Sequence, residues 1–280
     1  MNALATYSRM IKLSHSIFAL PFALAAALLA SREVSVSAGQ LLLIVLCMVT
    51  ARSSAMGFNR VVDRDIDAAN PRTAGREIPS GQISARAAWW FTVGSAVLFV
   101  VFAAMLGRLT LYLSPVAIAV IWGYSLSKRY TALCHLVLGL ALAIAPTAVW
   151  IALTGSFGAV PALLSLAVGT WVAGFDIIYA CQDADFDREQ GLNSIPSALG
   201  IRGALIASAA LHLVTMAALL ALPAVVSLGP VYYLGLLVIG GVLAYEHWIV
   251  RPDDLSRIDK AFFDLNGYVS LAFLVFVALA

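Results

Sequence analysis

Two short acidic stretches interrupt an otherwise apolar sequence: Asn59-Arg-Val-Val-Asp63-Arg-Asp-Ile-Asp67 and Tyr179-Ala-Cys-Gln-Asp183-Ala-Asp-Phe-Asp187. Each stretch holds two aspartates four residues apart, so a helix running through it would place both on one face. Asn59 lies one turn before the first pair, and Asp176 lies seven residues before Asp183. The sequence therefore predicts two rows of polar side chains, each following one helix face.

The residues after the two stretches are also similar. Both contain Ile-Pro-Ser, at 78–80 and at 195–197, followed by Arg86 in the first copy and Arg202 in the second. The first aspartates of the two stretches are 120 positions apart. A duplication of this kind indicates an internal repeat. We interpret the chain as two related four-helix units with a ninth helix added.

The surrounding sequence is typical of a polytopic membrane protein. Of its 280 residues, 62% are hydrophobic and only 11% are charged, whereas a soluble domain carries about 25% charged residues. This composition excludes a disordered chain, a disulfide scaffold and a coiled coil, and the net charge of +2 does not suggest a nucleic-acid partner. A helix that crosses a bilayer needs about 20 mostly apolar residues. The predicted spans are 15–31, 38–58, 87–106, 109–127, 132–153, 161–181, 203–222, 230–250 and 262–280.

The basic residues predict the orientation of these spans. Fourteen of the 17 Lys and Arg residues lie in the amino-terminal segment or in the loops after spans two, four, six and eight. Only Arg32 and Arg108 lie on the other side, and Arg52 falls inside the second span. The positive-inside rule therefore predicts a cytoplasmic amino terminus. The first span, preceded by Lys12, also resembles a signal peptide, but it leads directly into another span, which favours retention.

The acidic residues need a separate explanation, because the positive-inside rule does not require them. Carboxylates one turn apart repel each other, so two such rows at one end of a bundle predict a bound cation. Asp and Asn oxygens suit Mg²⁺, which proteins usually bind with few carboxylates plus phosphate oxygens. Nearby basic residues suit a diphosphate. The alternative is a set of solvated loops, which we favour only for Asp65, Asp185 and Glu189.

At these residues the chain resembles the UbiA superfamily of intramembrane prenyltransferases. Members of that family carry N-x3-D-x3-D in the second helix region and D-x3-D in the sixth. The motifs are specific together and weak singly, and the resemblance extends over essentially the whole chain. It is strongest to the 4-hydroxybenzoate polyprenyltransferases and to the related naphthoate prenyltransferases of menaquinone biosynthesis. The matching segments here are Asn59–Asp67, Asn70-Pro71-Arg72-Thr73 with Arg76, Tyr124-x3-Lys128-Arg129, Asp183–Asp187, and Gly191-x2-Ser194-x-Pro196.

The resemblance implies an all-α fold, with nine transmembrane helices round a central cavity in one domain over residues 1–280. It places the protein in a bacterial-type cell inner membrane, with the active site at the cytoplasmic face. The implied activity is Mg²⁺-dependent transfer of a polyprenyl group from polyprenyl diphosphate to an aromatic acid. The acceptor is either 4-hydroxybenzoate or 1,4-dihydroxy-6-naphthoate, in ubiquinone or menaquinone biosynthesis.

The resemblance also implies roles for individual residues. The metal ligands are Asn59, Asp63, Asp67, Asp183 and Asp187. The four aspartates among them, together with Asp176, are the catalytic residues. The diphosphate ligands are Arg72, Arg76, Lys128, Arg129 and Arg188. Aromatic faces that shield the allylic cation from water are Tyr124, Phe175 and Tyr179.

Arg52 and Asp176 extend this site toward the membrane interior. Arg52 lies seven residues before Asn59, and a membrane-buried Arg normally lines a cavity or meets a partner. We expect Arg52 either to bind the carboxylate of the acceptor or to pair with Asp176. Lys12 is a second candidate for the acceptor carboxylate. Asp176 is a candidate to orient or deprotonate the phenol of the acceptor.

The remaining polar residues predict less. The four histidines are scattered along the sequence, and we expect packing roles for them; only His135, shortly after Lys128, is placed to approach the site. Glu246, at the cytoplasmic end of the eighth span, is expected to reach water.

Two other functions fit parts of the pattern. A secondary transporter also uses repeats and buried charges, but here the acids lie at one membrane face instead of the midplane. A membrane phosphotransferase of the CDP-alcohol type is a second aspartate-rich Mg²⁺ enzyme, but its D-G-x2-A-R signature is absent from this sequence.

Overall fold

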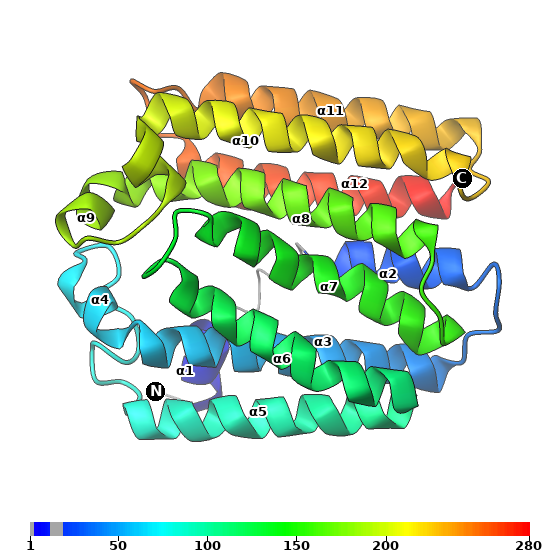
Figure 1. Ribbon diagram of the computed structural model, residues 1–280, viewed down its shortest axis with the longest axis horizontal. Coiled ribbons are helices and arrows are strands. Elements are labelled where there is room, and N and C mark those ends of the chain that lie inside the picture. The colour runs from blue at the N-terminus through cyan, green and yellow to red at the C-terminus, as the bar shows by residue number, and fades with distance from the viewer. Residues whose placement is uncertain (1–2, 12–18) are drawn as a thin grey trace. The chain divides into compact units, whose positions relative to one another are not determined.

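The computed structural model describes residues 3–11 and 19–280, and within them the regular structure is helical apart from one bridge between Arg251 and Asp254 (Figure 1). Eight of the described helices are long and apolar enough to cross a membrane. The chain is therefore an all-helical, multi-pass membrane protein, as the composition predicted. The helices are α1 (Ala3–Met10), α2 (Leu20–Ala30), α3 (Ala38–Val62), α4 (Arg64–Ala69), α5 (Ala85–Leu106), α6 (Arg108–Ser127), α7 (Cys134–Thr154), α8 (Ala159–Ala180), α9 (Ala184–Glu189), α10 (Ile195–Ala221), α11 (Pro230–Ile249) and α12 (Asn266–Ala278), with a π-helix at Lys260–Leu265.

The first predicted span, 15–31, is the one that differs most from a spanning helix. Its described part, α2, has 11 residues and begins with Pro21 in its first turn. Residues 12–18 lie outside the described part of the chain, and Lys12 and His15 with them. The ninth span therefore stays a prediction.

The helices form two compact units, residues 1–16 with 36–126 and residues 17–35 with 127–280. In the first unit α3 and α5 run side by side (Figure 1), and Gly57 allows this because a Cβ there would collide with Thr92. The α6 helix is attached through Trp122, whose Nε1 donates to Ser54 Oγ at 3.0 Å and whose ring stacks on Phe58. The single domain expected over the whole chain stays a prediction.

The second unit contains α2 and the helices from α7 onward. The α7 and α8 helices approach closely at Gly139, where an added Cβ would meet the Gly169 carbonyl oxygen. The α10 helix is joined to α8 by Ser208 Oγ, which donates to the Gly174 carbonyl at 2.8 Å. The α2 helix packs on α7 and α12 and stacks Phe22 on a ring of α12. It therefore packs with later helices, although the repeat assigns it to the first four.

Both helices that lead into the acidic stretches are interrupted at the first aspartate. The α3 helix ends at Val62, and Asp63 has φ −94° and ψ 3° before the six-residue α4 begins. The α8 helix passes into a 3₁₀ turn that ends at Asp183, which has φ −104° and ψ 6° before the six-residue α9. Neither stretch is therefore one uninterrupted α-helix. Asp favours such local departures because its side chain competes for backbone hydrogen bonds.

Candidate active site

The first acidic segment, residues 59–76, keeps its polar residues in one row despite the break. Asn59 Nδ2 donates to Asp63 Oδ2 at 2.9 Å. The backbone N–H of Asp63 bonds to the Asn59 carbonyl at 3.0 Å, and that of Asp67 to the Asp63 carbonyl at 2.7 Å. These i to i−4 bonds carry the helical register across Asp63. The predicted row therefore exists, and both carboxylates are buried, Asp63 at 2% and Asp67 at 3% exposure.

The Asp67 carboxylate is only half paired. Its Oδ1 accepts from Arg76 Nη1 at 2.6 Å, and Thr73 Oγ1 donates to the Asp67 carbonyl at 3.1 Å. Its Oδ2 is buried and makes no hydrogen bond among the described residues. A buried acceptor without a partner costs about 1–3 kcal/mol, and more when charged. A hard oxygen in this position fits a ligand for Mg²⁺.

The metal-ligand set within the described residues is small. No three His, Cys, Asp or Glu side chains converge there on a common metal-sized space. Mg²⁺ usually takes one or two protein carboxylates and completes its shell with waters and phosphate oxygens.

Arg60 belongs to the first acidic segment, although the sequence assigned it only to membrane orientation. It is 3% exposed, and its Nη1 lies 3.5 Å from Asn59 Oδ1. Asp67 and Glu77 attract the guanidinium, and Arg76 repels it. The sequence placed it just after the predicted span 38–58, whereas α3 continues through Arg60 to Val62. Among the other predicted residues of this unit, Arg72 is exposed, and Arg52 and Tyr124 are half-buried.

The second acidic segment, residues 183–195, is held by residues from far along the chain. The Leu192 N–H bonds to the Asp187 carbonyl at 2.8 Å, and the Asn193 N–H bonds to the Lys128 carbonyl at 2.7 Å. Ser194 hydrogen-bonds the Asp187 carboxylate, on which Asp183 and Lys128 also act electrostatically. The backbone of Lys128 is thus tied to this segment, and Arg129 follows it in the same loop, half-buried. The diphosphate-binding role of both residues stays a prediction.

Arg188 is turned away from the predicted role. Its Nη1 lies 2.7 Å from Asp185 Oδ1, and the side chains are 56% and 90% exposed. The Arg64–Asp65 pair is its counterpart in the first segment, with Asp65 87% exposed. Asp65 and Asp185 are therefore solvated, as the sequence predicted.

Asp176 pairs with a histidine. His135 Nδ1 and Asp176 Oδ2 are 2.7 Å apart, and the Ile195 N–H donates to His135 Nε2 at 3.3 Å. His135 thus does approach the predicted site residues. The expected Arg52–Asp176 ion pair joins residues of different units and stays a prediction.

The aromatic candidates of the second unit form a cluster that includes a residue the sequence did not point to. Phe175 is buried and meets the Phe262 ring edge-on at 5.3 Å, and Tyr179 lies 4.1 Å from the same ring. Phe262 belongs to the π-helix Lys260–Leu265. Contact between elements this far apart in sequence leaves no local periodic signal.

Comparison with known proteins identifies the family. The pattern of the UbiA prenyltransferase family matches residues 19–275. The chain belongs to the UbiA prenyltransferase family. It is therefore a member of a prenyltransferase enzyme family. This assignment takes the place of the transporter and phosphotransferase alternatives.

Relatives of this UbiA-family chain carry a consistent name. The 4-hydroxybenzoate octaprenyltransferase of Vibrio atlanticus (strain LGP32) is 32% identical over 83% of this chain and 81% of its own length. That of Alkalilimnicola ehrlichii is 32% identical over 84% of this chain and 80% of its own length.

Solved structures show the same fold. A UbiA homolog from Aeropyrum pernix K1, in its apo state, has a TM-score of 0.85 at 33% identity, covering 95% of this chain and 97% of that one. A UbiA homolog from Archaeoglobus fulgidus, bound to DMAPP and Mg²⁺, has a TM-score of 0.78 at 19% identity, covering 98% of both chains. The second likeness concerns the fold alone.

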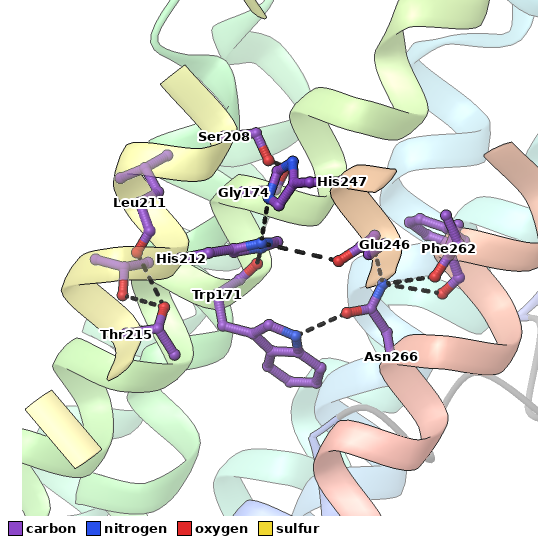
Figure 2. A network of polar contacts seen from close by, with 12 residues as sticks. Trp171, Gly174, Ser208, Leu211, His212, Thr215, Glu246, His247, Phe262 and Asn266 are labelled. Carbon is purple, nitrogen blue, oxygen red and sulfur yellow. Dashed lines mark hydrogen bonds and ion pairs between the residues drawn. The ribbon is translucent and has the colours of Figure 1, made fainter. Parts of the chain in front are cut away.

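A buried polar network in the second unit of this UbiA-family protein overturns the expectation for Glu246 (Figure 2). Glu246 is 1% exposed, and its Oε1 accepts from Asn266 Nδ2 at 3.1 Å, so it does not reach water. Asn266 Oδ1 accepts in turn from Trp171 Nε1 at 2.7 Å. His212 Nδ1 lies 3.0 Å from His247 Nε2 and 3.8 Å from Glu246 Oε2, so these two histidines have the packing roles that the sequence predicted. The partners come from α8, α10 and α12, which the sequence of α11 alone does not reveal.

Proposed function

We propose that this protein transfers a polyprenyl group from polyprenyl diphosphate to an aromatic acid in a Mg²⁺-dependent reaction. The first candidate acceptor is 4-hydroxybenzoate, because relatives covering most of the chain bear that activity in their names. The second is 1,4-dihydroxy-6-naphthoate, and the pathway is accordingly ubiquinone or menaquinone biosynthesis. The observation that carries the proposal is the buried Asp63–Asp67 row, in which Asp67 Oδ2 makes no hydrogen bond to any residue that the structure describes.

Each acidic segment is proposed to bind Mg²⁺ through its carboxylates, with diphosphate oxygens completing the coordination. Asn59, Asp63 and Asp67 serve the first segment, and Asp183 and Asp187 the second. Mg²⁺ supplies charge stabilisation to the leaving diphosphate. Structures of a UbiA homolog from Archaeoglobus fulgidus bound to DMAPP and Mg²⁺, and to GPP and Mg²⁺, support this for that protein.

The basic residues are proposed to hold the diphosphate from their own segments. Arg76, already fixed against Asp67 at 2.6 Å, and exposed Arg72 serve the first segment. Lys128 and Arg129 serve the second. Arg188 would have to leave Asp185 to take part, because the two are paired at 2.7 Å.

The chemical step is an electrophilic aromatic substitution. The allylic C–O bond breaks, and its electron pair leaves with the diphosphate. The aromatic ring forms the new C–C bond with the allylic cation and then loses its ring proton. Tyr124, Phe175 and Tyr179 shield the cation from water, Arg52 or Lys12 binds the acceptor carboxylate, and Asp176 orients or deprotonates its phenol.

The proposed function includes a detailed membrane topology. We propose nine spanning helices round a central cavity, built from two four-helix repeats and one further helix. The amino terminus and both acidic segments lie on the cytoplasmic side of a bacterial-type inner membrane, where a soluble aromatic acid and a lipid-like polyprenyl diphosphate meet.

The test is a product assay. Membranes containing the protein are given a polyprenyl diphosphate and either 4-hydroxybenzoate or 1,4-dihydroxy-6-naphthoate, with Mg²⁺ or with EDTA, and the lipid extract is analysed by mass spectrometry. We expect a prenylated acid with one acceptor only and none with EDTA. Failure with both acceptors in the presence of Mg²⁺, or equal yield with EDTA, contradicts the proposal.

A further inference from the structure

His135 occupies a position between three helices of the second unit. It lies in the first turn of α7 and is 3% exposed. Its Nδ1 lies 2.7 Å from Asp176 Oδ2 of α8, and its Nε2 lies 3.3 Å from the backbone N of Ile195, the first residue of α10. Both ring nitrogens therefore have a partner.

The partners define where the ring proton lies. A backbone N–H only donates, so Nε2 accepts from Ile195 and carries no proton. The neutral ring must then carry its proton on Nδ1, which donates it to the Asp176 carboxylate. Within the His135–Asp176 pair, the Asp176 side chain is the more open one, at 21% exposure against 4% for His135.

The Ile195 bond joins this pair to the second acidic segment. Ile195 follows Ser194, the N-cap of α10, and Ser194 hydrogen-bonds the Asp187 carboxylate. The first N–H groups of a helix have no partner within that helix, and His135 satisfies one of them from α7. A continuous series of contacts thus runs from Asp187 through Ser194, Ile195 and His135 to Asp176.

We infer that His135 is a positioning residue. It holds the Asp176 carboxylate in place to accept a hydrogen bond from the hydroxyl of a hydroxylated aromatic acceptor. The inference rests on the proposed function, in which Asp176 contacts that hydroxyl. A carboxylate hydrogen-bonded by a fixed N–H keeps both its charge and its direction. Through its bond to Ile195, the same ring also fixes the position of the Asp176 carboxylate relative to the segment that carries Asp187.

Two conservative substitutions separate the two bonds. The side-chain N–H of Asn superimposes on Nδ1–H, so His135→Asn retains a donor for Asp176 and loses the acceptor for Ile195. The carbonyl of Gln reaches the place of Nε2, so His135→Gln retains the acceptor for Ile195 and loses the donor for Asp176. Leu136→Ala, next in the chain and 39% exposed, is the matched control.

The experiment measures kcat and KM for each substrate with these variants in the Mg²⁺-dependent product assay. We expect His135→Gln to lower kcat/KM for the aromatic acceptor by about 10- to 100-fold. The KM of the polyprenyl diphosphate should change less than about threefold, and His135→Asn should recover most of the loss. Leu136→Ala should resemble the wild type. His135→Gln combined with Asp176→Asn should be no worse than Asp176→Asn alone, because both act through one carboxylate.

The outcomes are distinguishable. No product from the wild-type protein overturns the proposed function, and this inference with it. Product from the wild type, with equal losses in His135→Gln and His135→Asn that affect both substrates alike, overturns the inference alone, because it shows that His135 only packs. Additive losses in the double variant overturn it as well.

Discussion

The two acidic segments are built from the same local geometry but are held in place differently. In each, a long helix leads to an aspartate with φ near −100°, directly in the first segment and through a 3₁₀ turn in the second. A six-residue helix follows, and the second aspartate lies in it. In the first segment both aspartates are buried, and the partners of Asp67, Thr73 and Arg76, follow within nine residues. In the second segment Asp187 is half-buried, and the contacts extend to Lys128, 65 residues from Asn193. The pairs that hold Asp67 are thus local in sequence, whereas the contacts of the second segment reach a residue far along the chain.

The largest effect is expected from removing the second aspartate of each segment. Asp67→Asn should lower kcat/KM for the diphosphate by about 1,000-fold or more, because it removes the charge of a buried carboxylate proposed to bind Mg²⁺. Asp187→Asn should cost less, about 100-fold, since its half-exposed site admits water. Steady-state kinetics with Asp65→Asn, an exposed neighbour, as the control measures this. Equal losses of kcat/KM in Asp67→Asn and Asp187→Asn would show that the two segments do not differ in their contribution to catalysis.

The next effect comes from the ion pair inside the first segment. Arg76→Ala leaves both oxygens of Asp67 unpaired, so we expect a loss of about 2 kcal/mol in stability and about 10- to 100-fold in kcat/KM. Arg188→Ala removes the exposed pair of the second segment and should change either quantity very little. Thermal unfolding in detergent and kinetics measure both. A loss in Arg188→Ala as large as that in Arg76→Ala would show that the two segments do not differ in this way.

A smaller effect is expected at the helix cap of the second segment. Ser194→Ala removes the N-cap of α10 and a hydrogen bond to Asp187, so we expect about 1 kcal/mol of destabilisation and a diphosphate KM several-fold higher. Ser84 caps α5 by accepting from Ala87 N at 3.2 Å. Ser84→Ala should therefore cost similar stability with an unchanged KM. A KM that rises equally in both variants would indicate a general loosening of helix ends.

The smallest effect on catalysis is expected outside both segments. Asn266→Ala strands Trp171 Nε1 and Glu246 Oε1, so it should cost about 1–3 kcal/mol in stability while KM for both substrates is unchanged. Glu246→Gln keeps an oxygen for Asn266 Nδ2 and should be milder. A substrate-specific change in KM for either variant would mean that the network of Figure 2 takes part in the reaction.

How far the sequence predicts this molecule depends on the range of each interaction. Hydropathy predicts eight described spans closely, because each helix must bury apolar residues in lipid irrespective of its neighbours. The four-residue spacing likewise predicts the Asn59–Asp63–Asp67 row, which is local. The His135–Asp176 pair, the Phe262 contacts and the burial of Glu246 join helices that are distant in sequence. Nothing in the periodicity of one helix states which side chain its neighbour presents.

The helix break at Asp63 is a local feature that the sequence nevertheless does not predict. It is local, yet the spacing of the aspartates suits an unbroken helix equally well, because the backbone bonds of Asp63 and Asp67 preserve the register. Arg60 shows a different limit. A basic residue that satisfies the positive-inside rule needs no further explanation from sequence, so its burial beside the acidic row is visible only in the structure.

The central claim is that Asp67 binds the Mg²⁺ on which prenyl transfer depends. The direct measurement is the initial rate of product formation across a Mg²⁺ titration for the wild type, Asp67→Asn and Asp65→Asn. We predict that Asp65→Asn has the apparent Mg²⁺ constant of the wild type, and that Asp67→Asn needs at least about tenfold more Mg²⁺ for any residual rate. An Asp67→Asn enzyme with the wild-type rate and Mg²⁺ dependence would contradict the claim.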